Sequence, residues 1–263
     1  MFDLPVDLYQ NHLLAALPVT ELQELMPHLR KVHLPARKLL SDSGEPIKTM
    51  YFPTTAVLSL LCLMEDGATV EVAAVGTEGV TGIPVLMGGD AMPSRIEVAR
   101  EGYGYAVDAK HFKREFIRSN AINCLIMLYI QALMTSIVQS ALCNRRHSID
   151  EQLCRWLLSA HDRNHTNELI TTQQTIASTL GVRREGVTEA AGKLESAGLI
   201  QRRRGRITVV DREGLEERTC ECYSIIKSEF QRLLPARPND KDERTRNEMY
   251  RVIDAGRLHV MSC

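Results

Sequence analysis

The sequence predicts an α+β protein with a strand-rich N-terminal half, a long apolar helix and a C-terminal winged helix-turn-helix. Three observations predict it. Short β-prone runs separated by glycine turns fill residues 28–108, an uncharged apolar stretch occupies 121–143, and two amphipathic helices meet at Gly181 before a hairpin. With 263 residues, the chain is long enough for two domains that each bury a core.

We expect residues 1–27 to form an N-terminal helical segment and residues 28–109 to form a β domain. The β-prone runs include Met50–Phe52, Ala56–Cys62, Thr69–Val75 and Ile96–Ala99. Glu65-Asp66-Gly67 is a hairpin signal between two of them. Many short strands with closely spaced turn residues are typical of a small all-β sandwich or barrel.

A long helical segment is expected over residues 110–146. From Ala121 to Cys143 it has no Gly or Pro and is apolar over much of its circumference. Such a helix needs more cover than one small β domain supplies. We therefore predict that one side packs on the β domain and the other on the same helix of a second subunit, giving a homodimer. The alternative is burial within one chain.

Residues 147–215 are expected to form the winged helix. A supporting helix over 148–162 carries Trp156 as a core anchor. In the segment 173–194, Ala177 suits a close helix crossing, and Gly181 suits the left-handed conformation that ends the first helix. The apolar residues of the second helix repeat at i, i+4 and i+7, at Val187, Ala191 and Leu194. The alternative is an ordinary αα-hairpin.

The segment after the second helix predicts a basic hairpin wing. Two β-prone runs, Leu199–Ile200 and Ile207–Val210, flank an Arg-Gly turn. From Gly181 to Arg212 there are eight basic and four acidic side chains, in a chain of net charge −1. A local basic surface on a nearly neutral protein suits a polyanion bound by one face. The sequence therefore predicts nucleic-acid binding.

In this order of parts the chain resembles the Crp/Fnr family of bacterial transcription regulators. The resemblance spans roughly residues 20–225 and is most specific over Ser148–Asp211, with a further likeness in GTEGVTGIPVLMGG. It implies a β-roll, a jelly roll like that of cyclic-nucleotide-binding domains, and a dimerisation helix. It also implies a winged helix that reads a palindrome in double-stranded DNA. RNA polymerase is a further partner expected on this basis. The apolar residues of the segment 213–234 independently predict another helix, and residues 216–263 are assigned as a C-terminal helix and polar tail.

The family's DNA contacts can be carried over residue by residue. Its arginine–glutamate pair is matched by Arg184 and Glu185, which can bond guanine and cytosine edges respectively. Thr188 and Glu189 are the next outward positions, and Thr172 and Gln173 are candidate phosphate contacts or helix caps. The wing arginines would contact the DNA backbone. The expected DNA-binding residues are Thr172, Gln173, Arg183, Arg184, Glu185, Thr188, Glu189, Arg202, Arg203, Arg204 and Arg206.

The sensor half departs from the family's cyclic-nucleotide pattern. Gly82 is followed by Ile83 and not by the glutamate that binds ribose, and the family's Arg-Ser pair is reversed as Ser94-Arg95. Apolar Ile137 and Val138 replace the polar pair that touches the base. We therefore expect no binding of cyclic AMP. Gly82, Ser94 and Arg95 remain candidate effector contacts, and the cofactor, if any, is unknown.

The seven cysteines predict free thiols in a reducing compartment. No cysteine precedes Cys62, so an iron–sulfur cluster like that of the family's oxygen sensors is not expected. Cys220 and Cys222, at i, i+2 on an expected helix, would point to different sides and chelate poorly. Cys124 and Cys143 are expected in the core. No metal site is predicted.

The expected location is the cytoplasm, without a membrane partner. The N-terminus lacks the basic and apolar regions of a signal peptide, and no apolar run is judged to reach the roughly 18 residues of a membrane span. From Pro235 onward the chain is polar, which predicts a mobile tail with a short helix near Glu248–Ile253.

The sequence therefore predicts a dimeric, sequence-specific transcription regulator of the Crp/Fnr type, controlled by an unidentified signal sensed in the β-roll. The alternative is a ligand-responsive signalling module that acts through protein or RNA partners. An enzyme is not expected, because the sequence shows no nucleophile–base grouping, metal spacing or phosphate loop.

Overall fold

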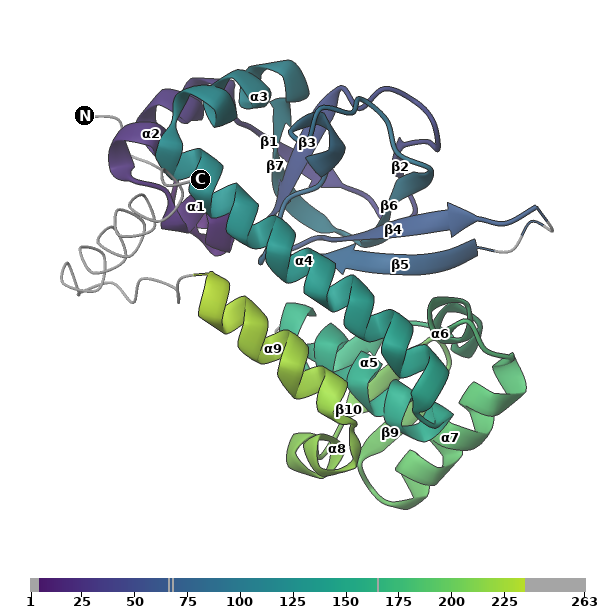
Figure 1. Ribbon diagram of the computed structural model, residues 1–263. Helices are drawn as coiled ribbons and strands as arrows, with labels where there is room; N and C mark the ends of the chain where they lie inside the picture. The colour runs from purple at the N-terminus through teal and green to yellow at the C-terminus, as the bar shows by residue number, and fades with distance from the viewer. Residues whose placement is uncertain (1–4, 66, 68, 165, 235–263) are drawn as a thin grey trace.

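The structure is a computed structural model that describes residues 5–65, 67, 69–164 and 166–234. Figure 1 shows a strand-rich N-terminal body and a mostly helical C-terminal body, with the long helix α4 running past both. The predicted tail from Pro235 onward, with its short helix near Glu248–Ile253, lies outside the described residues. So do Asp66 of the expected hairpin turn and His165.

The N-terminal segment is helical, as predicted. It comprises the 3₁₀ helix Val6–Gln10, α1 (His12–Ala16), α2 (Val19–Leu25) and the 3₁₀ helix Met26–His28. The fully buried Asn11 caps α1, because its side chain accepts from the backbone N–H groups of Leu13 and Leu14 at 3.2 Å each. The Asn11 amide donates to the carbonyls of Pro53 and Gly79 at 2.9 Å each, which ties this segment to the β domain.

The β domain consists of two antiparallel sheets. One has the order β1-β7-β3, with bounds Arg30–Leu34, Gly102–Asp108 and Thr49–Pro53. The other has the order β2-β6-β4-β5, with bounds Leu39–Ser41, Ser94–Arg100, Val57–Leu63 and Thr69–Val75. The four β-prone runs correspond to β3, β4, β5 and β6, whereas β1, β2 and β7 were not predicted. The short 3₁₀ helix Ile83–Val85 lies between β5 and β6 in the chain.

Two helices, and not one, occupy the segment expected to be a single long helix. They are α3 (Ala109–Arg118) and α4 (Asn120–Arg146). Ser119 between them has extended backbone angles, φ −99° and ψ 117°, and its hydroxyl accepts from the backbone N–H of Ile122. A serine that caps the second helix thus ends the first. The buried Tyr129 anchors α4 to the β domain by donating to the carbonyl of Val80 at 3.2 Å.

Helix α4 has the length and apolar composition of a membrane-spanning helix, with a mean hydropathy of 1.9 over its most apolar window. The expectation that no run reaches this length is therefore wrong, because the polar residues that interrupt it carry no charge. In that window, 33% of the residues are buried inside the chain. Core helices of soluble proteins can be equally long and apolar, so composition alone does not distinguish a core helix from a membrane-spanning one.

The C-terminal body has its own core. It contains α5 (Ile149–Asn164), β8 (Glu168–Ile170), α6 (Gln173–Leu180), α7 (Arg184–Ser196), β9 (Ile200–Arg203) and β10 (Arg206–Val209). The predicted hairpin is β9–β10, and β8, which was not predicted, extends it to the order β8-β10-β9. The fully buried Leu153 and Leu157 of α5 pack with Ile176 and Val187 of the two following helices, while Trp156 is only partly buried.

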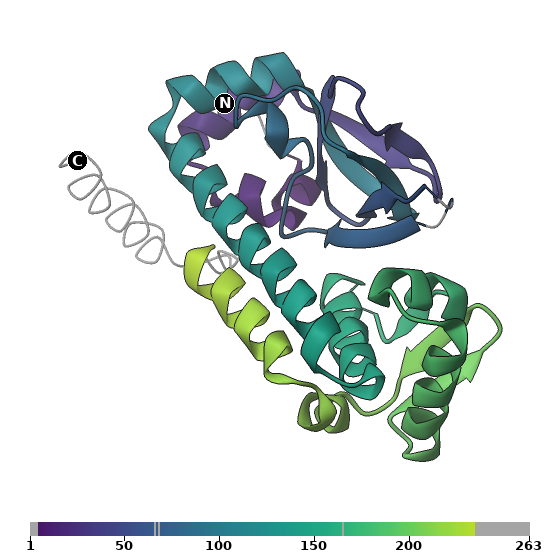
Figure 2. The same cartoon turned by 45° about the vertical axis from the view of Figure 1, so that its right-hand side comes forward.

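After the hairpin come α8 (Arg212–Arg218) and α9 (Glu221–Leu233), where a single helix was expected. Thr219 and Cys220 between them are extended, with ψ 157° and 166°. Cys220 therefore precedes α9, and the expectation that Cys220 and Cys222 point to different sides of one helix is wrong. Helix α9 runs alongside α4 in both views (Figures 1 and 2), a contact that was not predicted.

Candidate nucleic-acid interface

The turn between α6 and α7 has the geometry that its sequence predicts. Gly181 adopts the left-handed conformation with φ +66° and ψ 31°, and Ala177 is buried where the two helices meet. Thr172 caps α6, because its hydroxyl accepts from the backbone N–H of Thr175 at 3.1 Å. The structure thus places Thr172 in a capping role at the mouth of this motif.

Helix α7 presents a polar face at the outer edge of the C-terminal body (Figure 2). Arg184, Glu185, Thr188 and Glu189 are exposed on it, whereas Val187, Ala190, Ala191 and Leu194 are buried on the other side. Thr188 Oγ1 lies 2.8 Å from Gln173 Oε1, which links the two helices. Arg183 is exposed at the N-cap of α7. The predicted reading residues therefore share one accessible surface.

The carboxylate of Glu189 is partly neutralised within the protein. Lys193 Nζ lies 3.1 Å from Glu189 and 3.3 Å from Asp150. Hydrogen bonds to these two carboxylates raise the pKa of Lys193. Glu189 thus has a cation one helical turn away, which lowers the repulsion that a carboxylate facing phosphates would meet.

The wing arginines are of two kinds. Arg202 is held by Glu195, with Nη2 2.6 Å from one carboxylate oxygen and its backbone N–H donating to the other at 2.8 Å. These bonds, the side-chain one first, hold the pKa of Glu195 below its ordinary value. Arg206 similarly pairs with Glu168 at 2.6 Å. Arg203 and Arg204 are exposed at the hairpin end, and no carboxylate among the described residues pairs with either.

A hollow of about 470 Å³ lies between the start of α6, the start of α7 and the wing. We call it the basic hollow. Its lining residues are Thr171, Thr172, Gln173, Gln174, Arg184, Arg202, Arg203, Arg204, Gly205, Arg206 and Ile207. Five of these are arginines and none is acidic. A concave surface with this charge attracts a phosphate backbone.

The comparisons with known proteins agree with this geometry. Residues 151–218 match the family model of the Crp-like helix-turn-helix domain. These residues therefore carry a Crp-like helix-turn-helix domain. The predicted fold class, a β-roll, a long helix and a winged helix-turn-helix, is confirmed. A search of curated protein sequences finds no significant match.

Solved structures share the fold over most of the chain. A Crp/Fnr-family regulator from Eubacterium rectale is 20% identical with a TM-score of 0.59, covering 77% of this chain and 94% of that one. FixK2 from Bradyrhizobium japonicum is 15% identical with a TM-score of 0.64, covering 73% and 98%. The c-di-GMP-responsive regulator CLP from Xanthomonas campestris is 15% identical with a TM-score of 0.59, covering 73% and 99%.

The candidate effector residues are not brought together in one pocket. Gly82 adopts φ +89° before the 3₁₀ helix, where a Cβ would meet Met50 at 2.9 Å. Ser94 is buried on β6, and Arg95 beside it lies 3.5 Å from Asp42. Since neighbouring residues of a strand point to opposite faces, the side chains of Ser94 and Arg95 project to opposite sides of β6.

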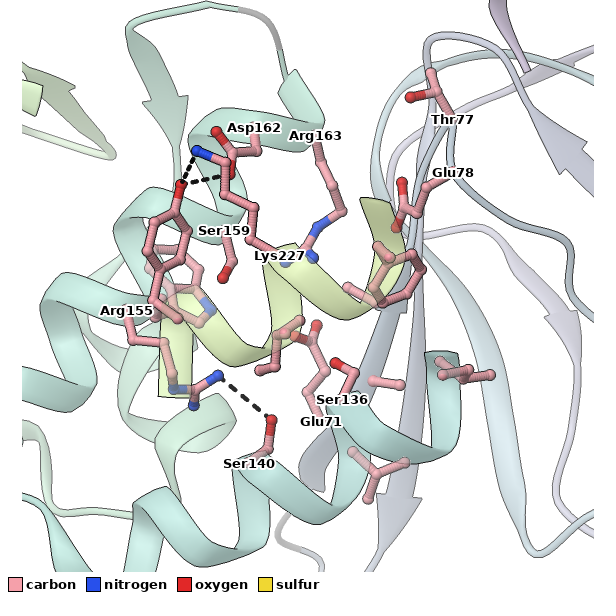
Figure 3. A pocket seen from close by; sticks show the side chains of 18 of the residues that line it. Glu71, Thr77, Glu78, Ser136, Ser140, Arg155, Ser159, Asp162, Arg163 and Lys227 are labelled. Carbon is pink, nitrogen blue, oxygen red and sulfur yellow. Dashed lines mark hydrogen bonds between the residues drawn. The ribbon is translucent and has the colours of Figure 1, made fainter. Parts of the chain in front are cut away.

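A different cavity, of about 440 Å³, lies where β5, α4, α5 and α9 meet. We call it the inter-domain cavity; Figure 3 shows its polar side chains, which come from both bodies. Arg155 donates to Ser140 Oγ at 3.3 Å, and Tyr223 donates to Asp162 at 2.8 Å. Glu71 projects into it from β5. This cavity was not predicted from the sequence, because its lining residues lie far apart along the chain.

Burial raises the pKa of Glu71, although a hydrogen bond from the Ser59 hydroxyl and the positive charge of Arg163 act in the other direction. Tyr223, between Asp162 and Lys227, has its pKa raised by burial and then by the hydrogen bond to Asp162. These groups sit between the β-roll and the helix-turn-helix. Any change in their charge therefore acts on the contact between the two bodies.

Proposed function

We propose that the regulator acts as a homodimer that reads a palindromic site in double-stranded DNA through α7. The observation that carries this proposal is the polar face of α7 beside the basic hollow, in which Arg184 lines the same concavity as the wing arginines. In this assignment Arg184 and Glu185 contact base edges, with Arg183, Thr188 and Glu189 beside them. Arg203 and Arg204 contact phosphates.

The other predicted residues have two different roles in this assignment, one in the wing and one at the start of α6. Arg202 and Arg206, already paired with carboxylates, hold the wing in position. Thr172 and Gln173 fix the start of α6 and its link to α7, which leaves the backbone N–H groups of that helix start near the basic hollow. A helix N-terminus is a suitable place for a phosphate.

Helix α4 supports the dimer. Its exposed apolar side chains gather toward its C-terminal half, at Met127, Met134, Ile137, Val138 and Leu142, with exposures of 38–58%. The spacing of Met127, Met134 and Val138, seven and then four residues, is that of a coiled-coil seam. Neither the β-roll nor α9 covers these side chains. A two-fold pairing of α4 helices would bury them and present two α7 faces to one duplex.

The signal that controls the regulator is proposed to act where the β-roll meets the DNA-binding domain. The inter-domain cavity supports this, because side chains of both bodies line it. We also infer a cytoplasmic location, a regulatory and not a catalytic role, and RNA polymerase as a partner on promoters. These three inferences rest on the proposed binding to DNA and on the likeness of residues 151–218 to the Crp-like helix-turn-helix domain.

Selection from a library of random duplexes tests the proposal. We expect enrichment of a palindrome whose half-sites are about one helical turn apart, 10–10.5 bp centre to centre. We also expect a steep decrease in affinity with salt. Salt-dependent binding with no preferred sequence, or equal binding to single-stranded RNA, would instead favour the alternative of a signalling module with RNA or protein partners.

A further inference from the structure

Four potential metal ligands meet at the junction of α4 and α9. Cys143 and His147 come from the end of α4, and Cys220 and Cys222 from the start of α9. One ligand atom from each residue lies within 4.8 Å of all the others. The three cysteines are buried and His147 is partly buried, which keeps the cluster away from bulk water.

The distances suit a small tetrahedral cation. The sulfur atoms of Cys143 and Cys220 are 3.5 Å apart, and Cys222 Sγ is 3.7 Å from His147 Nδ1. In a tetrahedral zinc site with Zn–S bonds of about 2.3 Å, neighbouring ligand atoms are about 3.8 Å apart. Three thiolates and one imidazole are a donor set that selects zinc.

The surroundings complete the site. His147 Nε2 lies 3.3 Å from the Glu221 carboxylate, so Nδ1 is the ring nitrogen left to face the sulfur atoms. Such carboxylate–histidine pairs orient the ligands of zinc sites. Arg155, which is buried, donates from Nε to Cys143 Sγ at 3.2 Å. One divalent cation with three thiolates and a neutral histidine carries a net charge of −1, which this guanidinium balances.

We propose that Cys143, His147, Cys220 and Cys222 form a structural zinc site that fastens α9 to α4. The binding reaction exchanges protons for metal: Zn²⁺ enters, three thiols each lose a proton to solvent, and three Zn–S bonds and one Zn–N bond form. No position remains for water or substrate, so the site would be structural. It would hold α9 against the helix that carries the proposed dimer seam.

Metal analysis of the full-length protein, purified under reducing conditions, tests the proposal. We expect about one zinc per chain, and replacement by Co²⁺ should give the visible d–d bands and thiolate charge-transfer absorption of a tetrahedral site. The variant Cys220→Ser with Cys222→Ser should lose both. The matched control is Cys62→Ala with Cys124→Ala, two free cysteines outside the cluster, and it should retain both.

A second measurement separates loss of metal from loss of fold. Chelation should lower the melting temperature of the native protein and of the control, but not that of the Cys220/Cys222 double variant. Added zinc should restore the melting temperature of the native protein and of the control only. His147→Ala keeps the three sulfur ligands and should weaken zinc binding without abolishing it. The proposal is overturned if the reduced native protein takes up no zinc, or if the double variant binds zinc equally well. It is also overturned if Cys143 and Cys220 are joined by a disulfide that persists when the cell extract is prepared under reducing conditions.

Discussion

At the scale of single residues, Arg184 differs from the other arginines of the interface in its position. It is exposed at the first turn of α7, it lines the basic hollow, and no carboxylate among the described residues pairs with it. A guanidinium placed in this way can bond both acceptors of a guanine edge. Arg203, at the wing, can reach phosphates but has no comparable route to a base.

The variant Arg184→Ala should therefore lose specific binding by about 1–3 kcal/mol per half-site, with relaxed preference at one base pair. Arg203→Ala should weaken binding to all sequences alike and reduce the salt slope by about one. Titrations of selected and scrambled duplexes at several salt concentrations measure both effects. If Arg184→Ala binds the selected palindrome with native affinity, α7 is not the reading helix.

Glu71 gives the protein a pH-dependent contact. Burial raises its pKa in the folded state above the ordinary value of 4.5, so folding favours the neutral acid. The stability it contributes is fully present below pH 4.5 and is lost as the pH rises through the raised folded-state value. Above that raised value the ionised carboxylate thus opposes folding.

Replacing Glu71 by Gln removes this charge and keeps an acceptor for the Ser59 hydroxyl. The melting temperature of Glu71→Gln should exceed that of the native protein at pH 7, and the difference should shrink as the pH is lowered toward 4.5. Glu45→Gln, at an exposed loop position, is the matched control and should change little at any pH. A constant difference from pH 4.5 to pH 8 would mean that Glu71 does not titrate as argued.

At the scale of elements, two of the glycines of the helix-turn-helix, Gly181 and Gly192, have opposite roles. Gly181 holds a left-handed conformation, and a Cβ added there would meet nothing within 4 Å. The cost of a side chain is therefore backbone strain alone. Gly192 lies inside α7, where a Cβ would meet only the tip of Arg202 at 3.8 Å, and helix interiors favour alanine over glycine.

Thermal unfolding of two variants compares these roles. Gly181→Ala should destabilise the protein by about 1–2 kcal/mol, and Gly192→Ala should stabilise it by about 1 kcal/mol. Each kcal/mol corresponds to roughly 2–4 °C for a chain of this size class. Gly181→Asn is the conservative variant, since asparagine tolerates this conformation, and it should cost less than alanine. Equal effects of alanine at both positions would contradict the turn geometry.

The elements also show where sequence patterns were sufficient. The helices α5, α6 and α7 and the strands β3–β6 follow from local periodicity and turn residues. Strand β7 was missed since Gly102 and Gly104 interrupt its pattern. Gly104 is required by its sheet partner: a Cβ there would meet the carbonyl oxygen of Phe52 at 2.8 Å. The break at Ser119 depends on a single capping side chain.

The candidate sites also differ in whether the sequence could predict them. The reading face of α7 is a local motif and could be predicted within one segment. The inter-domain cavity and the cysteine–histidine cluster are assembled from distant segments, and Cys143 and Cys220 are 77 residues apart. The extended backbone at Cys220, on which the cluster depends, follows from the end of α8. No spacing rule within one segment reveals such a pair.

At the scale of the whole molecule, α4 contacts the β-roll and α9 and carries an exposed apolar face. One face carries Tyr129 into the β-roll, another packs against α9, and a third exposes the apolar seam defined above. Two α4 helices paired along this seam would place the DNA-binding domains on either side of a two-fold axis. Binding to a full palindrome would then gain from linkage of the two half-sites.

Replacing Met134 and Val138 together by Glu tests this arrangement. Both side chains are more than half exposed, at 58% and 57%, so the monomer should fold normally, while two buried charges would prevent pairing of the helices. Sedimentation should show a monomer, and affinity for the full palindrome should fall by about 10²–10⁴ with half-site contacts intact. Ile117→Glu, on α3 and 72% exposed, should remain dimeric. A Met134/Val138 variant that still sediments as a dimer would place the two-fold axis elsewhere.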